Sequence, residues 1–369
     1  MEALRDRGAD LIGVWGLGGV GKTTLAKEVG QRMKAEGVFQ LVITTEVHPK
    51  ADVKAIQERV AEWVEIKKEV KSLDSVELRA ALLHKRLLQE ESVLVILDDV
   101  WDAIDLKKVG IPIGGNTNRC TVLVTTRDES LVSQMAVQKQ KSFQLNVLRD
   151  DEAWELFQKM VGDIPEDDLV HHDVATQIVN RCGGLPILVL PVATALKNKS
   201  LAMWEDALQR LESGLLKNGD GMQALAYSAL ELSCHHLGED QKFLFLFCGL
   251  LEPSDIDIGD IVKYMVGLSL FKDCLTVKAT RSRVLKLLGD LTSSCLLLKG
   301  DNNDSFTMHD VVHSFVRGYS DHVFSPADYS MLVEWPDKHA LEQFTQISLR
   351  YCQSPDLPST LECPNLKTL

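Results

Sequence analysis

A glycine cluster followed by a lysine and a threonine is the feature of this sequence best suited to chemistry. Residues 16–23 read Gly-Leu-Gly-Gly-Val-Gly-Lys-Thr, which fits the pattern G-x-x-x-x-G-K-[ST]. Glycine tolerates positive φ, so such a loop can turn its backbone N–H groups toward an anion at a helix N-terminus. Lys22 would reach the β- and γ-phosphates of a nucleotide, and the Thr23 hydroxyl would bind Mg²⁺. The alternative is a glycine-rich turn with a chance lysine.

Two aspartates and an arginine follow apolar runs further along the chain. The run at 94–97 ends on Asp98 and Asp99, and a run that begins at Cys120 ends before Arg127. Because ligands bind beyond the carboxyl ends of parallel strands, these side chains are expected near the glycine loop. Asp98 would hold Mg²⁺, and Asp99 would orient or deprotonate a water. Arg127 would contact a γ-phosphate and so sense which nucleotide is bound; a solvated surface arginine is the alternative.

Apolar runs alternate with amphipathic segments over the first part of the chain. That alternation predicts a parallel sheet with helices on both faces. The predicted strands are Leu11–Trp15, Leu41–Thr45, Ser92–Leu97, Cys120–Thr126 and Phe143–Val147, and the predicted helices are Lys22–Ala35, Asp52–Val70 and Ser75–Leu88.

The pattern becomes almost entirely helical after Leu148. The motif Gly183-Gly184-Leu185-Pro186 ends one helix and starts the next. Later, a predicted strand pair at Leu296–Lys299 and Phe306–Met308 is compatible with a winged-helix module. The predicted helices are Asp151–Val161, Asp168–Arg181, Ile187–Lys197, Leu201–Ser213 and Met222–Ser233.

The tail from Leu341 has spaced leucines typical of the first one or two leucine-rich repeats, with an irregular tail as the alternative.

Composition narrows the class of protein. The 369 residues are 45% hydrophobic and 25% charged, which is ordinary for a globular chain of two or three domains. The net charge of −13 disfavours non-specific binding to nucleic acid or anionic membrane. No apolar run approaches the length of a transmembrane segment, and the charged N-terminus lacks the core of a secretory signal. The eight cysteines form no Cys-x-x-Cys pair, which predicts a reduced, cytoplasmic protein in which Cys248 and Cys295 are core residues.

The order of these motifs resembles the NB-ARC nucleotide-binding domain of plant disease-resistance proteins, a group of signal-transducing P-loop ATPases. The resemblance covers residues 11–325, and four motifs in this order are specific to the family. The similar segments are 13–24 (P-loop), 97–101 (kinase-2, ending in Trp101 as in the coiled-coil branch), 124–127, 182–187 (GLPL, with Ile for the last Leu), 245–248 (the CxLFPED segment, with a weak acidic end) and 308–310 (MHD).

The resemblance implies a role for each matched residue. Pro186 would pack near the adenine and ribose, and His309 would hydrogen-bond the ADP β-phosphate and lock the winged-helix module. Asp98 and Asp99 would serve hydrolysis, with Thr23 and Asp98 as Mg²⁺ ligands. The remaining residues expected to bind ADP or ATP are Gly18, Gly19, Val20, Gly21, Lys22, Thr23, Thr24 and Arg127.

The fold expected from this resemblance is an α/β P-loop NTPase sheet followed by a helical bundle, a winged-helix-like module and the start of a leucine-rich repeat. The expected boundaries are 1–148, 149–222, 223–325 and 340–369. Relative to the family, the N-terminal coiled coil, an upstream segment of the adenine pocket and most of the repeats are missing, so the chain is expected to be a fragment.

The function implied is an ADP/ATP switch of plant innate immunity. ADP would hold the off state, ATP would favour an on state able to form homo-oligomers, and slow hydrolysis would reset the switch. A P-loop ATPase or small-molecule kinase with steady turnover is the alternative, although no arginine-rich lid is evident. A DNA-binding regulator is disfavoured, because residues 221–325 hold 9 Lys and Arg against 13 Asp and Glu, a net of −4. The expected partner is therefore a nucleotide, with no nucleic acid and no transmembrane segment.

Overall fold

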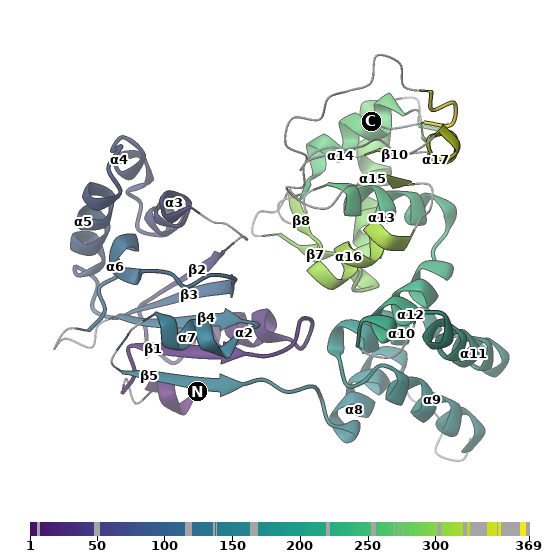
Figure 1. The fold of residues 1–369 in the computed structure, drawn as a ribbon, viewed down its shortest axis with the longest axis horizontal. Coiled ribbons are helices and arrows are strands. Elements are labelled where there is room, and N and C mark those ends of the chain that lie inside the picture. Colours follow the sequence, from purple (N-terminus) through teal and green to yellow (C-terminus); the bar gives the residue numbers. More distant parts are fainter. Residues whose placement is uncertain are drawn as a thin grey trace. The chain divides into compact units, whose positions relative to one another are not determined.

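The computed structural model divides into two compact units, 1–147 and 148–369 (Figure 1). The residues that it describes are 1–5, 8–47, 52–114, 120–135, 137, 139–162, 169–218, 222–251, 256–268, 270–271, 273–274, 276–300, 304–319, 323–324, 338–344, 346–347 and 362–366.

A five-stranded parallel sheet forms the centre of the N-terminal unit. Its order is β2-β3-β4-β1-β5, so β4 lies between β1 and β3 and the carboxyl ends of these three strands are adjacent. This confirms the predicted parallel sheet. The strands are β1 (Leu11–Trp15), β2 (Leu41–Glu46), β3 (Val93–Val100), β4 (Cys120–Thr126) and β5 (Gln140–Gln144).

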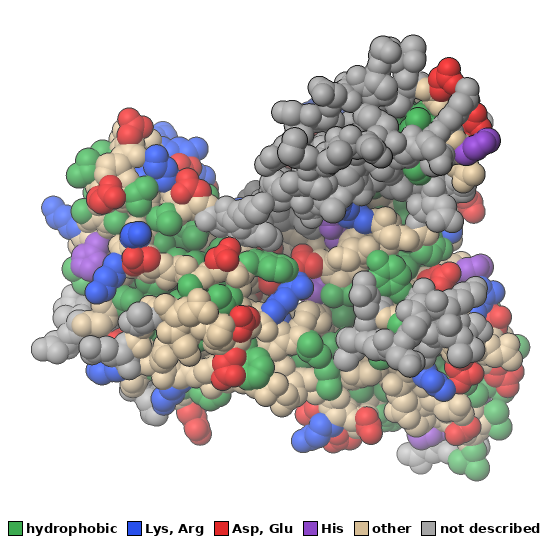
Figure 2. Space-filling model, in the orientation of Figure 1, with side chains coloured by type: hydrophobic (Ala, Val, Ile, Leu, Met, Phe, Trp, Pro, Cys, Tyr) green, Lys and Arg blue, Asp and Glu red, His purple; other side chains and the backbone are tan. Residues whose placement is uncertain are grey.

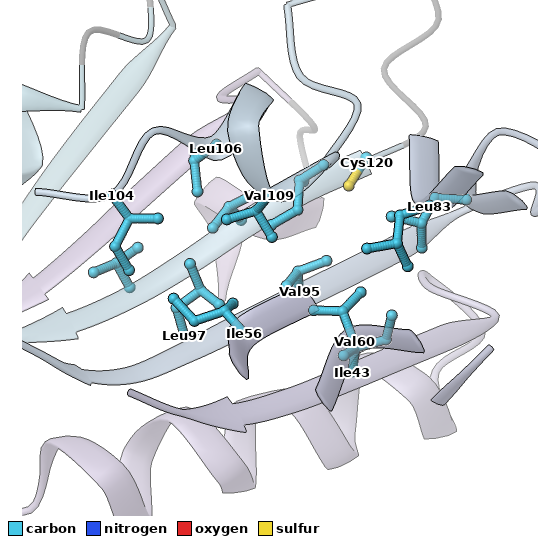
Figure 3. Close-up of a cluster of buried hydrophobic side chains, with 14 of the residues drawn as sticks. Ile43, Ile56, Val60, Leu83, Val95, Leu97, Ile104, Leu106, Val109 and Cys120 are labelled. Carbon is cyan, nitrogen blue, oxygen red and sulfur yellow. The ribbon is translucent and has the colours of Figure 1, made fainter. Parts of the chain in front are cut away.

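Helices cover the sheet on both faces because buried side chains alternate along the inner strands. On β3, Leu94 and Ile96 pack with Met33 of α2, whereas Val95 and Leu97 belong to the core beneath α3, α5 and α6 (Figure 3). The period of two thus divides one strand between two hydrophobic cores. The helices are α1 (Glu2–Arg5), α2 (Lys22–Ala35), α3 (Val53–Trp63), α4 (Lys67–Lys71), α5 (Val76–Leu87), α6 (Leu106–Val109) and α7 (Glu129–Gln134).

The predicted strand Ser92–Leu97 extends as β3 through Asp98 and Asp99 to Val100. Two other predicted elements of this unit differ more in the structure. The last strand is Gln140–Gln144 rather than Phe143–Val147, because backbone pairing with β1 sets its register while all five side chains are exposed. The predicted helix Asp52–Val70 is divided into α3 and α4, because Glu65 has a φ of 60° in the left-handed region.

Acidic and basic side chains are interspersed on the visible surface of α4 and α5 (Figure 2). Lys71 and Arg79 both pair with Glu58 of α3, at 3.4 and 3.1 Å.

The C-terminal unit is mainly helical. Helix α10 contacts α8 and α12, and α11 contacts α9 and α12. Trp204 of α11 is buried, packs edge-to-face on Phe157 of α8 and donates its Nε1–H to Leu196 O at 3.1 Å. The helices are α8 (Asp150–Val161), α9 (Leu169–Arg181), α10 (Pro186–Leu196), α11 (Leu201–Asn218), α12 (Met222–His235), α13 (Glu239–Leu250), α14 (Ile258–Gly267), α15 (Val277–Ser293), α16 (Asp310–Tyr319) and α17 (Lys338–Gln343).

A small antiparallel sheet lies among α13–α16. The predicted strand pair is confirmed as β7 (Leu298–Lys299) and β8 (Ser305–Thr307), and a further strand, β6 (Ile256–Asp257), pairs with the other edge of β8. Two short strands near the C-terminus, β9 (Val323–Phe324) and β10 (Gln346–Ile347), pair in parallel. Most of the predicted leucine-rich repeat, including Leu357 and Leu361, lies outside the described residues. Within the described ranges, no helix combines the length and apolarity required to cross a bilayer.

Several thiols are enclosed in the two units. Cys248 is completely buried in α13, as predicted, and Cys182 is completely buried at the end of α9. Burial raises the pKa of both thiols to about 12. Cys295, which was also predicted to be a core residue, is only half-buried; it follows α15 and has a φ of 57°.

Candidate functional site

The glycine loop joins β1 to α2 and leaves the start of that helix open to an anion. Gly19 has a φ of 77° and Gly21 a φ of 102°, which are left-handed conformations that L-residues rarely adopt. Gly21 is the N-cap of α2, no side chain caps the helix, and its first turn holds no acidic residue. The first backbone N–H groups of a helix have no intrahelical acceptor, so this terminus suits a phosphate group.

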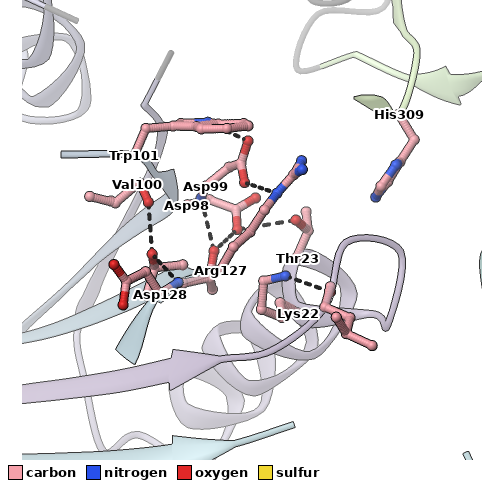
Figure 4. A network of polar contacts seen from close by, with 12 residues as sticks. Lys22, Thr23, Asp98, Asp99, Val100, Trp101, Arg127, Asp128 and His309 are labelled. Carbon is pink, nitrogen blue, oxygen red and sulfur yellow. Dashed lines mark hydrogen bonds and ion pairs between the residues drawn. The ribbon is translucent and has the colours of Figure 1, made fainter. Parts of the chain in front are cut away.

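Lys22 brings a buried positive charge to the same loop. Its side chain folds over the loop, and its Nζ donates to Gly16 O and Leu17 O, both at 2.9 Å (Figure 4). Only 7% of the residue is exposed. The ammonium is therefore held over the loop backbone by carbonyl oxygens, where charge-assisted hydrogen bonds are strong.

Asp98 of β3 joins α2 and β4 through one carboxylate oxygen. Its Oδ1 accepts a hydrogen bond from Thr23 Oγ1 at 3.1 Å and another from Thr125 Oγ1 (Figure 4). Asp98 is 3% exposed, at the end of β3. Thr125 Oγ1 also accepts from the Asp99 N–H at 2.8 Å. The structure thus brings together the loop after β1 and the ends of β3 and β4.

Thr125 belongs to the motif at 124–127, where the sequence predicted a role only for Arg127. Its signal is a hydroxyl at a fully buried position of β4, two residues before Arg127. Because β4 lies between β1 and β3, that hydroxyl can bridge them.

Asp99 and Arg127 lie beside this centre. The bulge between Leu97 and Val100 interrupts the pairing of β3 with β4, and Asp99 has a φ of 54°. Arg127 Nε lies 3.9 Å from Asp99 Oδ1. Backbone strain of this kind is concentrated at functional sites.

The oxygen atoms of this centre fit a hard divalent cation. Mg²⁺ binds through one or two carboxylates, with hydroxyl and phosphate oxygens completing its octahedron. Thr23 Oγ1 and Asp98 Oδ1 supply a hydroxyl and a carboxylate within hydrogen-bond distance of one another.

If Asp98 binds Mg²⁺, the variant Asp98→Asn is expected to reduce about tenfold or more the gain in nucleotide affinity that Mg²⁺ provides, because it removes the charge of the carboxylate while preserving its size. Calorimetric titration of ADP with and without Mg²⁺ measures the effect. The matched control is Asp102→Asn, at an exposed position just beyond β3. An unchanged Mg²⁺ dependence in Asp98→Asn would contradict the assignment.

Pro186 and His309 belong to the C-terminal unit, and their roles toward a nucleotide stay predictions. Pro186 is the first residue of α10, where its fixed φ favours helix initiation. The Nδ1 of His309 accepts the Val311 N–H at 3.2 Å at the start of α16, so a neutral ring carries its proton on Nε2.

Comparison with known proteins places these motifs in a family. The model described as NB-ARC domain matches residues 1–167. Disease resistance protein At4g27190 of Arabidopsis thaliana is 32% identical over 321 residues, which are 85% of this chain and 32% of that protein. Residues 1–167 of this chain are an NB-ARC domain. Within this NB-ARC chain, the assignment of Trp101 to the coiled-coil branch stays a prediction.

Other comparisons agree with the NB-ARC assignment. The putative disease resistance protein At5g05400 of Arabidopsis thaliana is 28% identical over 100% of this chain and 42% of its own length. The NB-ARC chain thus spans about a third to two fifths of these relatives.

A solved structure of a signal-transduction ATPase with numerous domains, which carries a tetratricopeptide repeat sensor and comes from Pyrococcus horikoshii, is similar in fold. The TM-score is 0.53 at 15% identity, over 86% of this chain and 41% of that one.

Proposed function

We propose that this NB-ARC chain is the nucleotide-operated switch of a plant disease-resistance signalling protein. The observation that carries the proposal is the pair of hydrogen bonds from Thr23 and Thr125 to Asp98 Oδ1, which join the glycine loop to the ends of β3 and β4. The similarity to disease resistance proteins over most of the chain supports the signalling context.

Each residue of the centre has a task in this proposal. Lys22 and the N–H groups at the start of α2 bind the β-phosphate of ADP or ATP. Thr23 and Asp98 hold Mg²⁺, which supplies charge neutralisation when bound. Asp99 orients the attacking water, and Arg127 meets the γ-phosphate of ATP.

The switch itself requires two arrangements of the chain with different affinities for ADP and ATP, since only that difference moves the population. ADP stabilises the resting arrangement, and ATP favours one that associates with further copies. Slow hydrolysis of ATP restores the resting form. The protein carries out this cycle in the cytoplasm.

In this scheme His309 holds the resting state by donating from Nε2 to the ADP β-phosphate. The variant His309→Ala is expected to release ADP about tenfold faster, because one hydrogen bond between an imidazole and an anion is lost. Release of a fluorescent ADP analogue after dilution measures the rate. The exposed His339→Ala is the matched control. Equal release rates in the parent and in His309→Ala would show that His309 is not the lock.

Nucleotide exchange and turnover together test the proposed function. The expected protein binds ADP, exchanges it for ATP and turns ATP over far more slowly than once per second. Steady turnover on the order of one per second or faster would instead favour an ATPase or small-molecule kinase.

A further inference from the structure

Trp101 lies against the two residues that would act on the γ-phosphate. Its Nε1–H donates to Asp99 Oδ2 at 2.9 Å. The guanidinium carbon of Arg127 lies 4.5 Å from the centroid of the Trp101 ring, within the range of a cation–π interaction. With the approach of Arg127 Nε to Asp99 Oδ1 at 3.9 Å, the three side chains form a closed triangle (Figure 4). We call Asp99, Trp101 and Arg127 the tryptophan triangle.

Burial does not account for the position of Trp101. The residue is 38% exposed, so much of the indole faces solvent and its orientation depends on the contacts with Asp99 and Arg127. The backbone supports the same arrangement, because Asp99 lies in the left-handed region and donates its N–H to Thr125 Oγ1. A strained residue, an exposed indole and a cation therefore converge at the end of β3 and β4.

The guanidinium of Arg127 contacts both of the other side chains in this triangle. Its Cζ lies 4.5 Å from the centroid of the indole ring, and its Nε lies 3.9 Å from Asp99 Oδ1, so two neighbours restrict the position of the guanidinium. A long side chain fixed in this way loses less rotamer freedom when it binds an anion, and preorganisation of this kind increases affinity.

We propose that Trp101 is a positioning residue that holds Arg127 ready for the third phosphate of a nucleoside triphosphate. Through this contact the tryptophan triangle raises the affinity of the site for ATP and leaves that for ADP unchanged. The inference rests on the proposed nucleotide function and adds a residue to it. Because ADP has no γ-phosphate, loss of Trp101 acts on ATP affinity alone.

The test compares ATP and ADP affinities of the full chain with Mg²⁺ by displacement of a fluorescent nucleotide. The variant Trp101→Leu removes both the cation–π contact and the hydrogen bond, and the expected loss of ATP affinity is roughly 3- to 10-fold with unchanged ADP affinity. The variant Trp101→Phe keeps a ring beneath Arg127 and is expected to recover part of the ATP affinity. Unchanged ADP affinity also shows that the site remains folded.

The matched control is Trp63→Leu. Trp63 is likewise exposed, at 48%, and its Nε1–H donates to Thr44 O at 3.1 Å. The variant therefore removes a similar hydrogen-bonded indole that does not contact Arg127. Neither nucleotide affinity is expected to change in this control.

A double-mutant cycle with Arg127→Gln separates positioning from a general structural effect. If Trp101 acts through Arg127, Trp101→Leu has no further effect on ATP affinity in the Arg127→Gln background. Equal losses for ATP and ADP, or the same loss with and without Arg127, would overturn the inference while leaving the proposed function intact. A parent protein that binds neither nucleotide would overturn the proposed function, and with it the role of Trp101.

Discussion

The variant Lys22→Ala is expected to carry no nucleotide after purification, whereas the parent protein carries ADP. The ammonium of Lys22 is held over the glycine loop by two carbonyl oxygens and is 7% exposed. A phosphate bound there would gain charge-assisted hydrogen bonds in a partly desolvated environment. Hydrogen bonds to charged groups contribute about 1.5–3 kcal/mol each, so loss of the ammonium should weaken binding roughly 100-fold or more.

Anion-exchange chromatography of the supernatant from denatured protein measures the nucleotide that Lys22→Ala carries. A matched control is Lys107→Ala, at an exposed position of α6. Circular dichroism confirms that each variant is folded. ADP retained by a folded Lys22→Ala at the level of the parent would show that Lys22 does not hold the phosphates.

The variant Gly184→Ala is expected to destabilise the helical unit by about 2–3 kcal/mol. Gly184 has a φ of 66°, and a Cβ at this position would lie 2.3 Å from Leu148 O, a backbone atom that cannot rotate away. The same peptide segment accepts a hydrogen bond, since Leu148 N–H donates to Gly184 O at 2.8 Å. The left-handed conformation costs an L-residue about 1 kcal/mol, and relief of the clash would break that hydrogen bond.

Hydrogen exchange of the amides in α8 and α10 measures the local effect of Gly184→Ala, and urea denaturation measures the loss in the whole chain. The control Gly289→Ala lies within α15, where a Cβ would meet no atom within 4 Å. There alanine should stabilise the helix by about 0.5–1 kcal/mol. If both variants have the same stability, the contact of Gly184 with Leu148 is not a structural requirement.

The GLPL motif therefore has a local structural role that is independent of any nucleotide. Because Gly184 has no Cβ, the backbone of Leu148, which follows β5, can approach it closely. Pro186 then starts α10. The resemblance implied only that Pro186 packs near the adenine and ribose.

Local signals were sufficient to predict the elements that carry the site. The run Leu11–Trp15 and the helix Lys22–Ala35 have the predicted bounds, because an apolar strand, a glycine loop and a clear helical period follow one another directly. The strand at Cys120–Thr126 is also as predicted, since its seven consecutive buried positions form an uninterrupted run without charged residues in the sequence.

The remaining features depend on neighbours that are remote in sequence. β5 is exposed along its length, so its bounds follow from pairing with β1 and leave no hydrophobic pattern. The bond between Thr125 and Asp98 requires β4 to lie beside β3, and the order of strands in a sheet cannot be determined from strand periodicity. The position of Trp101 depends on the bulge in β3 between Leu97 and Val100. No glycine marks this bulge in the sequence, so the bulge could not be predicted.

The reactivity of the buried thiols would measure how often each unit unfolds locally. A thiol with a pKa near 12 holds almost no thiolate at neutral pH, so alkylating reagents react with it only after the surrounding core separates. Cys120 lies in β4 of the N-terminal unit, whereas Cys182 and Cys248 lie in the C-terminal unit. Mass spectrometry of alkylated peptides would therefore give separate opening rates for the two units of the unmodified chain, with no dye or introduced cysteine.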